Sequence, residues 1–190
     1  LDKSSPDPLP VMLAEAHRLE NAGVDLIVMP CNTAHYFYDG LQKGCKTPIL
    51  NIIDETTAHL SRIGVKTFGL LATEGTIRSG AYERFCAPRG LACITPTEEE
   101  QAVISDIIYG QIKQNKPVDT VLFEGVVNSL RARGCEKIVL GCTELSLLKK
   151  EGIDKEFFVD SLDVLAYRTI LACGKTPVDF STSYDLEVAR

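Results

Sequence analysis

The sequence has few of the residues that several classes of protein require. It holds three histidines and no Cys-x-x-Cys pair, so a zinc site has few ligands to draw on. Basic residues are not in excess, and the formal net charge of −6 with a pI near 5.1 argues against a nucleic-acid or anionic-membrane surface. No apolar run is long enough to span a bilayer, and the first residues lack the pattern of a secretory signal. We therefore expect no metal, nucleic-acid or membrane partner.

The cysteines indicate a reducing compartment. They number seven, an odd count without the dense, even framework of small secreted folds, so we expect free thiols and a cytoplasmic protein. The apolar content of 45% and charged content of 24% are those of an ordinary soluble globular protein. Because the sequence does not begin with methionine, we expect it to be a piece of a longer protein.

Helical segments and short apolar strands alternate along the chain. The spacing of apolar residues predicts strands at 24–29, 48–53, 67–71, 91–95, 137–140 and 157–159, with helices at 11–22, 34–43, 54–62, 77–87, 98–113, 119–133 and 161–172. Alternation of this kind predicts an α/β fold in which parallel strands are joined by right-handed crossovers.

The two halves of the chain repeat one pattern. Gly23 precedes Cys31 by eight residues, and Gly134 precedes Cys142 by eight, each time across a helix stop and an apolar strand. The repeat predicts two pseudo-symmetric lobes, each a parallel sheet flanked by helices, with the active site in the cleft between them. We place the first lobe at residues 1–62 plus 163–190 and the second at 63–162. Chance resemblance between ordinary strand–helix units is the alternative.

The repeated cysteines fall where α/β proteins bind ligands. Cys31 and Cys142 each follow a strand, at the edge where helix N-termini point outward, and a helix dipole there lowers the pKa of a thiol. Asn32, Thr33 and Thr143 add amide and hydroxyl donors suited to a carboxylate. Two thiols facing one molecule across a cleft could remove a proton from one face of a carbon and deliver one to the other, which inverts a stereocentre.

These motifs resemble those of the aspartate/glutamate racemase family. The resemblance rests on Cys-Asn-Thr at 31–33, Ala-Thr-Glu-Gly-Thr at 72–76, Ser-Gly-Ala-Tyr at 79–82 and Gly-Cys-Thr-Glu at 141–144. The glutamate at position 144 resembles the aspartate racemase branch of the family, since glutamate racemases usually have histidine at that position. The resemblance covers nearly the whole chain.

The resemblance implies a cofactor-independent, homodimeric racemase that interconverts the L- and D-forms of an acidic amino acid, with aspartate as the expected substrate. The implied catalytic residues are Cys31 and Cys142, and the implied substrate-binding residues are Asn32, Thr33 and Thr143 on the α-carboxylate, Thr73 and Thr76 lining the cleft, and Lys113 as a cation.

The chain also departs from the family pattern. Only residues 1–30 precede Cys31, whereas family members have a strand, a glycine-rich turn and a substrate-binding arginine ahead of it. We therefore expect the first lobe to lack that strand. This favours an alternative in which the chain is a catalytically impaired homologue that binds a small carboxylate or only dimerises. A related isomerase or decarboxylase acting on another carboxylic acid is a third hypothesis.

Several candidate residues also have purely structural interpretations. Thr73 and Thr76 could simply cap the helix that follows them. His35 could tune Cys31, although a helix-surface or dimer-contact role is the favoured interpretation. The remaining cysteines lack polar neighbours of the same kind and are interpreted as structural: Cys45, Cys86, Cys93, Cys135 and Cys173.

Overall fold

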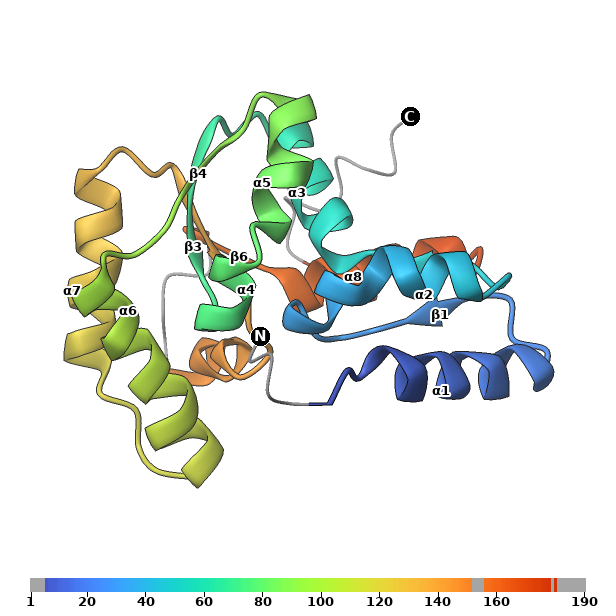
Figure 1. The fold of residues 1–190 in the computed structure, drawn as a ribbon. Coiled ribbons are helices and arrows are strands. Elements are labelled where there is room, and N and C mark those ends of the chain that lie inside the picture. The colour runs from blue at the N-terminus through green and yellow to red at the C-terminus, as the bar shows by residue number, and fades with distance from the viewer. Residues whose placement is uncertain (1–5, 152–155, 179, 181–190) are drawn as a thin grey trace.

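Two parallel sheets organise the chain. The computed structural model describes residues 6–151, 156–178 and 180. The smaller sheet pairs β1 (Ile27–Val28) with β2 (Ile49–Leu50), and the larger has the strand order β4 (Ala92–Ile94), β3 (Thr67–Leu71), β5 (Lys137–Leu140), β6 (Phe158–Asp160). Neighbouring strands pair in parallel in both sheets (Figure 1). The predicted α/β fold with two parallel sheets flanked by helices is confirmed.

The larger sheet is the central layer of a three-layer arrangement. Leu70 and Val139 pack into one apolar cluster, while Leu71 and Leu140, each the next residue along its strand, pack into the other. This alternation follows from the two-residue period of a strand. One face is covered by α3 (Ile52–Arg62), α5 (Ala81–Cys86) and α8 (Ser161–Ala172), and the other by α6 (Glu98–Ser105) and α7 (Thr120–Ala132).

The smaller sheet has its own apolar cluster. Ile27 and Ile49 of the strands pack with Ala16 of α1 (Leu9–Asn21) and Leu41 of α2 (Tyr38–Gly44). The remaining short elements are α4 (Glu74–Arg78), a π-helical segment at Asp106–Gln111, and 3-10 segments at Thr33–Phe37, Ala87–Arg89, Ile112–Gln114 and Leu145–Glu151.

Glycines end the helices that lead into β1 and β5. Gly23 has φ 78° and Gly134 has φ 87°, in the left-handed region that glycine adopts without steric cost. Each lies two residues after the end of its helix, α1 or α7. The predicted helix stops are therefore confirmed, and the order helix, glycine, strand, cysteine occurs in both halves.

Several predicted helices differ from those observed. The segment predicted as one helix over 34–43 is a 3-10 segment at Thr33–Phe37 followed by α2, and the helix predicted over 77–87 is divided into α4 and α5 at Gly80, which has φ 63°.

The helix predicted to begin at residue 54 begins at Ile52, because the side-chain oxygen of Asn51 accepts hydrogen bonds from the backbone N–H groups of Ile53 and Asp54. The helix predicted over 98–113 is α-helical only to Ser105 and then widens into the π-helical segment. The Asp106 carboxylate fills the space where a side chain at Gly110 would stand.

The two sheets are formed by different parts of the chain and differ in size. The two-stranded sheet lies within residues 1–62 and the four-stranded sheet within 63–162. Residues from α3, β3 and α8 share one apolar cluster, so the two parts are joined by a continuous core. The lobe boundaries themselves stay a prediction. Within the described residues, no helix has both the length and the apolar character needed to cross a bilayer.

Candidate active site

Each cysteine loop follows a strand of a parallel sheet, but the two cysteines lie in different surroundings. Cys31, beyond the end of β1, is exposed, whereas Cys142, beyond the end of β5, is buried with 7% of its surface accessible. The backbone N–H of Gly141 donates to the carbonyl of Leu71 at 2.7 Å, and a Cβ at Gly141 would lie only 2.8 Å from a methyl carbon of Leu70. Glycine at 141 therefore lets the second cysteine loop lie against the end of β3.

Three of the predicted substrate-binding threonines come together. The Thr33 hydroxyl lies 2.8 Å from that of Thr73 and 2.7 Å from that of Thr76, and the last two are 3.1 Å apart. We call these three side chains the threonine cluster. Thr73 also caps α4 by accepting from the backbone N–H of Thr76, so the capping interpretation is confirmed for Thr73, whereas Thr76 lies within α4. The cluster joins the loop after β1 to the loop after β3.

Asn32 is buried and held at both ends of its amide. Its Nδ2 donates to the Ser161 hydroxyl at 3.0 Å, and its Oδ1 accepts from the Tyr82 hydroxyl at 2.8 Å. Ser161, which is fully buried, donates in turn to the carbonyl of Leu140 at 2.8 Å. A hydrogen-bonded path thus connects the residue after Cys31 to the end of the strand that precedes Cys142.

A second group of predicted residues meets at Glu144. The Cys142 thiol donates to Glu144 Oε2 at 2.9 Å, and the Thr143 hydroxyl donates to the same oxygen at 3.3 Å. Lys113 Nζ lies 3.3 Å from Glu144 Oε1. We call these four side chains the Glu144 cluster. Burial alone would raise the pKa of Glu144, but the Cys142 hydrogen bond and Lys113 hold it below its ordinary value, so the carboxyl group is ionised.

The expectation of a lowered pKa at Cys142 is wrong. Burial, followed by the hydrogen bond to Glu144, raises the pKa of Cys142 to about 12. The 3-10 segment after the loop begins only at Leu145, and the adjacent carboxylate disfavours a second negative charge. Cys142 is therefore a protonated thiol near neutral pH.

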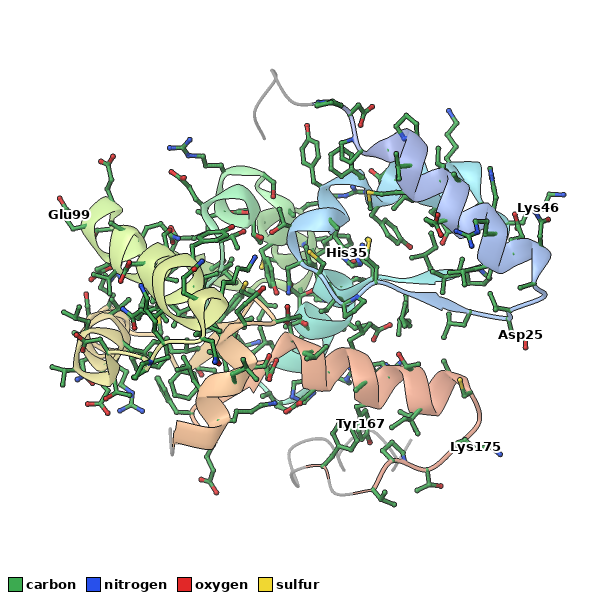
Figure 2. The ribbon with its side chains drawn as sticks, turned by 90° about the horizontal axis from the view of Figure 1, so that it is seen from below. Asp25, His35, Lys46, Glu99, Tyr167 and Lys175 are labelled. Atoms are coloured by element: carbon green, nitrogen blue, oxygen red, sulfur yellow. The ribbon has the colours of Figure 1, made fainter. Side chains whose placement is uncertain are left out.

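His35 connects the first cysteine loop to the start of α3. Ile52 donates its backbone N–H to His35 Nε2 at 3.2 Å, so Nδ1 carries the ring proton and donates to the carbonyl of Cys31 at 2.8 Å. Burial lowers the pKa of His35, which keeps the ring neutral. Figure 2 shows His35 near the middle of the view, where the segment after β1 approaches the rest of the chain. The favoured interpretation of His35 as a helix-surface or dimer-contact residue is wrong, because the side chain is buried within its own chain.

A cavity of about 180 Å³ lies beside this histidine. It is lined by residues around the first loop and α5, among them His35, Tyr38 and Arg84, and by none of the predicted site residues. Within the ranges that the structure describes, no group of three or more His, Cys, Asp or Glu side chains is arranged to hold a metal ion.

Three side chains of the site were not predicted as site residues. Ser161 and Tyr82 hold Asn32, and Glu144 holds Cys142. Glu144 follows Cys-Thr directly in the sequence, so its position beside the thiol was a usable signal. Tyr82 lies in one of the motifs that resemble the family, although nothing linked it to Asn32, and Ser161 gave no signal.

Comparison with known proteins gives a consistent set of relatives. Residues 2–169 match the Asp/Glu/hydantoin racemase family. The broad-specificity amino-acid racemase RacX of Bacillus subtilis (strain 168) is 29% identical over 157 residues, which cover 82% of this chain and 67% of RacX. A glutamate racemase of Aquifex pyrophilus is 33% identical over 144 residues, which cover 70% of this chain and 51% of that enzyme, so the match spans about half its length.

The solved structures agree with this grouping. The aspartate racemase of Picrophilus torridus superimposes with a TM-score of 0.76 at 28% sequence identity, covering 97% of this chain and 76% of that one. The family match over residues 2–169, together with this shared fold, identifies the chain as a member of the Asp/Glu/hydantoin racemase family.

Proposed function

We propose that this protein is a cofactor-independent amino-acid racemase that acts on an acidic amino acid, with aspartate as the expected substrate, through two-base chemistry by Cys31 and Cys142. The observation that carries the proposal is the path from Asn32 through Ser161 to the carbonyl of Leu140. It joins the two cysteine loops through buried side chains, and racemisation by two bases requires that both sulfurs reach one carbon.

The surroundings of Cys142 suit it to donate a proton. Its thiol is protonated near neutral pH, and Glu144 fixes the direction of the S–H bond. In a turnover that starts from this state, a thiolate at Cys31 takes the α-proton, and Cys142 gives its proton to the opposite face of the carbon. One C–H bond breaks and one forms, and the two sulfurs exchange protonation states. Proton exchange of both sulfurs with solvent restores the starting state before the next turnover in the same direction, and the reverse reaction uses the exchanged state directly.

Removal of an unactivated α-proton requires strong stabilisation of the carboxylate that receives the negative charge. Hydroxyl and amide donors fixed before the reaction supply it at little reorganisation cost. The threonine cluster and the second amide hydrogen of Asn32 provide such donors, whereas the Thr143 hydroxyl donates to Glu144. Thr73 and Thr76 are themselves buried. Lys113 is the positively charged residue of the Glu144 cluster, and we propose that it binds the distal carboxylate of the substrate.

The direct test is incubation of the purified protein with L-aspartate in deuterium oxide, followed by NMR of the α-proton and chiral chromatography. Loss of the α-proton signal together with appearance of D-aspartate is expected. Cys31→Ala and Cys142→Ala should each abolish inversion, and persistence of inversion in either variant would refute the two-base mechanism. Calorimetric binding of aspartate without exchange would instead select the carboxylate-binding homologue.

Two further predictions concern the whole protein. A homodimer is implied by the family resemblance, and a cytoplasmic location by the cysteine composition. Light scattering coupled to size-exclusion chromatography measures the first, and fractionation of the source cells tests the second.

A further inference from the structure

The charge on Lys113 is already balanced before any substrate binds. Its ammonium lies 3.3 Å from Glu144 Oε1, and the other Glu144 oxygen accepts from Cys142 and Thr143. Glu144 therefore belongs to two interactions at once, one with the proposed proton donor and one with the proposed cation for the distal carboxylate.

Lys113 is held in place but remains accessible. It follows the π-helical segment, and its ammonium stands over the Tyr109 ring, 4.8 Å from the ring centroid, a favourable cation–π contact. The Lys113 side chain is 44% exposed, against 25% for Glu144. One side of the ammonium is thus open to a ligand while the other is occupied by the protein's own carboxylate.

We infer that Glu144 is a specificity-determining residue, which competes with the distal carboxylate of an acidic substrate for Lys113 and so allows amino acids with neutral side chains to be used as well. This inference rests on the proposed function. A lysine ammonium has three donors, so the competition concerns charge more than hydrogen bonds. A second carboxylate gains less attraction from a cation that is already paired. A neutral side chain does not depend on that attraction and loses nothing.

The test compares L-aspartate with L-asparagine, whose distal groups are nearly equal in size but differ in charge, since an amide replaces the carboxylate. The ratio of kcat/KM for the two substrates is measured in the wild type, Glu144→Gln, Lys113→Met and the double variant. Loss of the Glu144–Cys142 hydrogen bond affects both substrates alike and cancels in the ratio. Glu100→Gln is the matched control, because Glu100 is also a half-buried carboxylate in an ion pair, with Arg133 at 2.7 Å, away from the cysteines.

Glu144→Gln should raise the preference for aspartate about fivefold, the size expected for a partly exposed charge contact, and Lys113→Met should lower it. In the Lys113→Met background, Glu144→Gln should leave the ratio nearly unchanged. An unchanged ratio in Glu144→Gln, or an equal change in both backgrounds, would overturn the inference, since the second result means simple repulsion without competition for Lys113.

Measurements of amino-acid binding distinguish a failure of this inference from a failure of the proposed function. Calorimetric dissociation constants for both amino acids, measured on the same proteins, should follow the same pattern even if no variant racemises either one. If the protein racemises both amino acids but the ratio of kcat/KM does not change as predicted, only the competition at Lys113 is refuted. If the dissociation constants change as predicted but no racemisation occurs, only the catalytic proposal is refuted. If neither amino acid binds, both are refuted.

Discussion

Asn32 and Ser161 are 129 positions apart in the sequence, yet their side chains share a buried hydrogen bond of 3.0 Å. Asn32 follows Cys31 directly, and Ser161 is the first residue of α8. Because Ser161 also donates to the carbonyl of Leu140, one hydroxyl group holds both cysteine loops at once. Its loss would leave the Asn32 N–H buried without this partner, which costs about 1–3 kcal/mol.

Ser161→Ala should therefore separate proton exchange from inversion. With the loops less firmly aligned, one thiol can still exchange the α-proton on its own face, but delivery to the opposite face becomes slower. We expect the rate of inversion to fall about tenfold, with retention of configuration in much of the deuterated product. Chiral chromatography with mass spectrometry measures both quantities.

The control for this variant is Thr57→Val, which removes another buried hydroxyl, bonded to the carbonyl of Ile53 at 3.0 Å within α3. It should lower stability without changing the ratio of exchange to inversion. If Ser161→Ala behaves in the same way, Ser161 has only a structural role.

The Glu144–Cys142 contact predicts the pH dependence of thiol reactivity. With a pKa of about 12, about one Cys142 in ten thousand is a thiolate at pH 8. Glu144→Gln removes a negative charge and a hydrogen-bond acceptor for the thiol, so the pKa of Cys142 should fall and its alkylation at pH 8 should become about tenfold faster or more. Timed iodoacetamide labelling and mass spectrometry of the Cys142 peptide measure this, with Glu100→Gln as control. Identical labelling profiles between pH 8 and 10 would contradict the assignment.

His35 predicts a loss of stability on acidification. Because burial lowers its pKa, the folded protein binds fewer protons than the unfolded chain once the pH falls below about 6.5. The stability contributed by neutral His35 is thus present above that pH and is lost as the pH falls toward the lowered value. His35→Gln should reduce the slope of unfolding free energy between pH 7 and 5, as measured by urea denaturation. His17→Gln, which removes an exposed histidine of α1, is the matched control, and an unaltered slope in His35→Gln would refute the prediction.

The fold was predictable where local patterns determine it. The glycines at 23 and 134 stop helices because of their own backbone conformation, and the strands after them are short apolar runs. Those features are encoded within about ten residues, which is why both cysteine loops were placed correctly at strand ends. Thr33 was predicted from its place after a strand, whereas Thr73 and Thr76 were predicted from the family resemblance.

The site was less predictable where distant residues decide its chemistry. A helix N-terminus would lower the pKa of Cys142, but only a 3-10 segment follows this loop, and burial and a carboxylate two residues away raise the pKa instead. The change from α-helix to π-helix before Lys113, where the Asp106 carboxylate lies against Gly110, is a second feature of this kind. Neither effect follows from the spacing of apolar residues.

Thr33 gives a prediction that distinguishes the two ends of the substrate. Its hydroxyl contacts both Thr73 and Thr76, and the proposal assigns this cluster to the α-carboxylate, which every amino-acid substrate carries. Thr33→Val keeps the shape but removes a donor to a charged group, worth about 1.5–3 kcal/mol, so KM should rise about tenfold or more. Because the α-carboxylate is common to both, the rise should be equal for aspartate and asparagine. Thr169→Val, which removes a partly buried hydroxyl bonded within α8, should change neither KM. If KM rises for aspartate alone, Thr33 binds the distal carboxylate and not the α-carboxylate. The substrate would then lie in the opposite orientation between the threonine cluster and the Glu144 cluster.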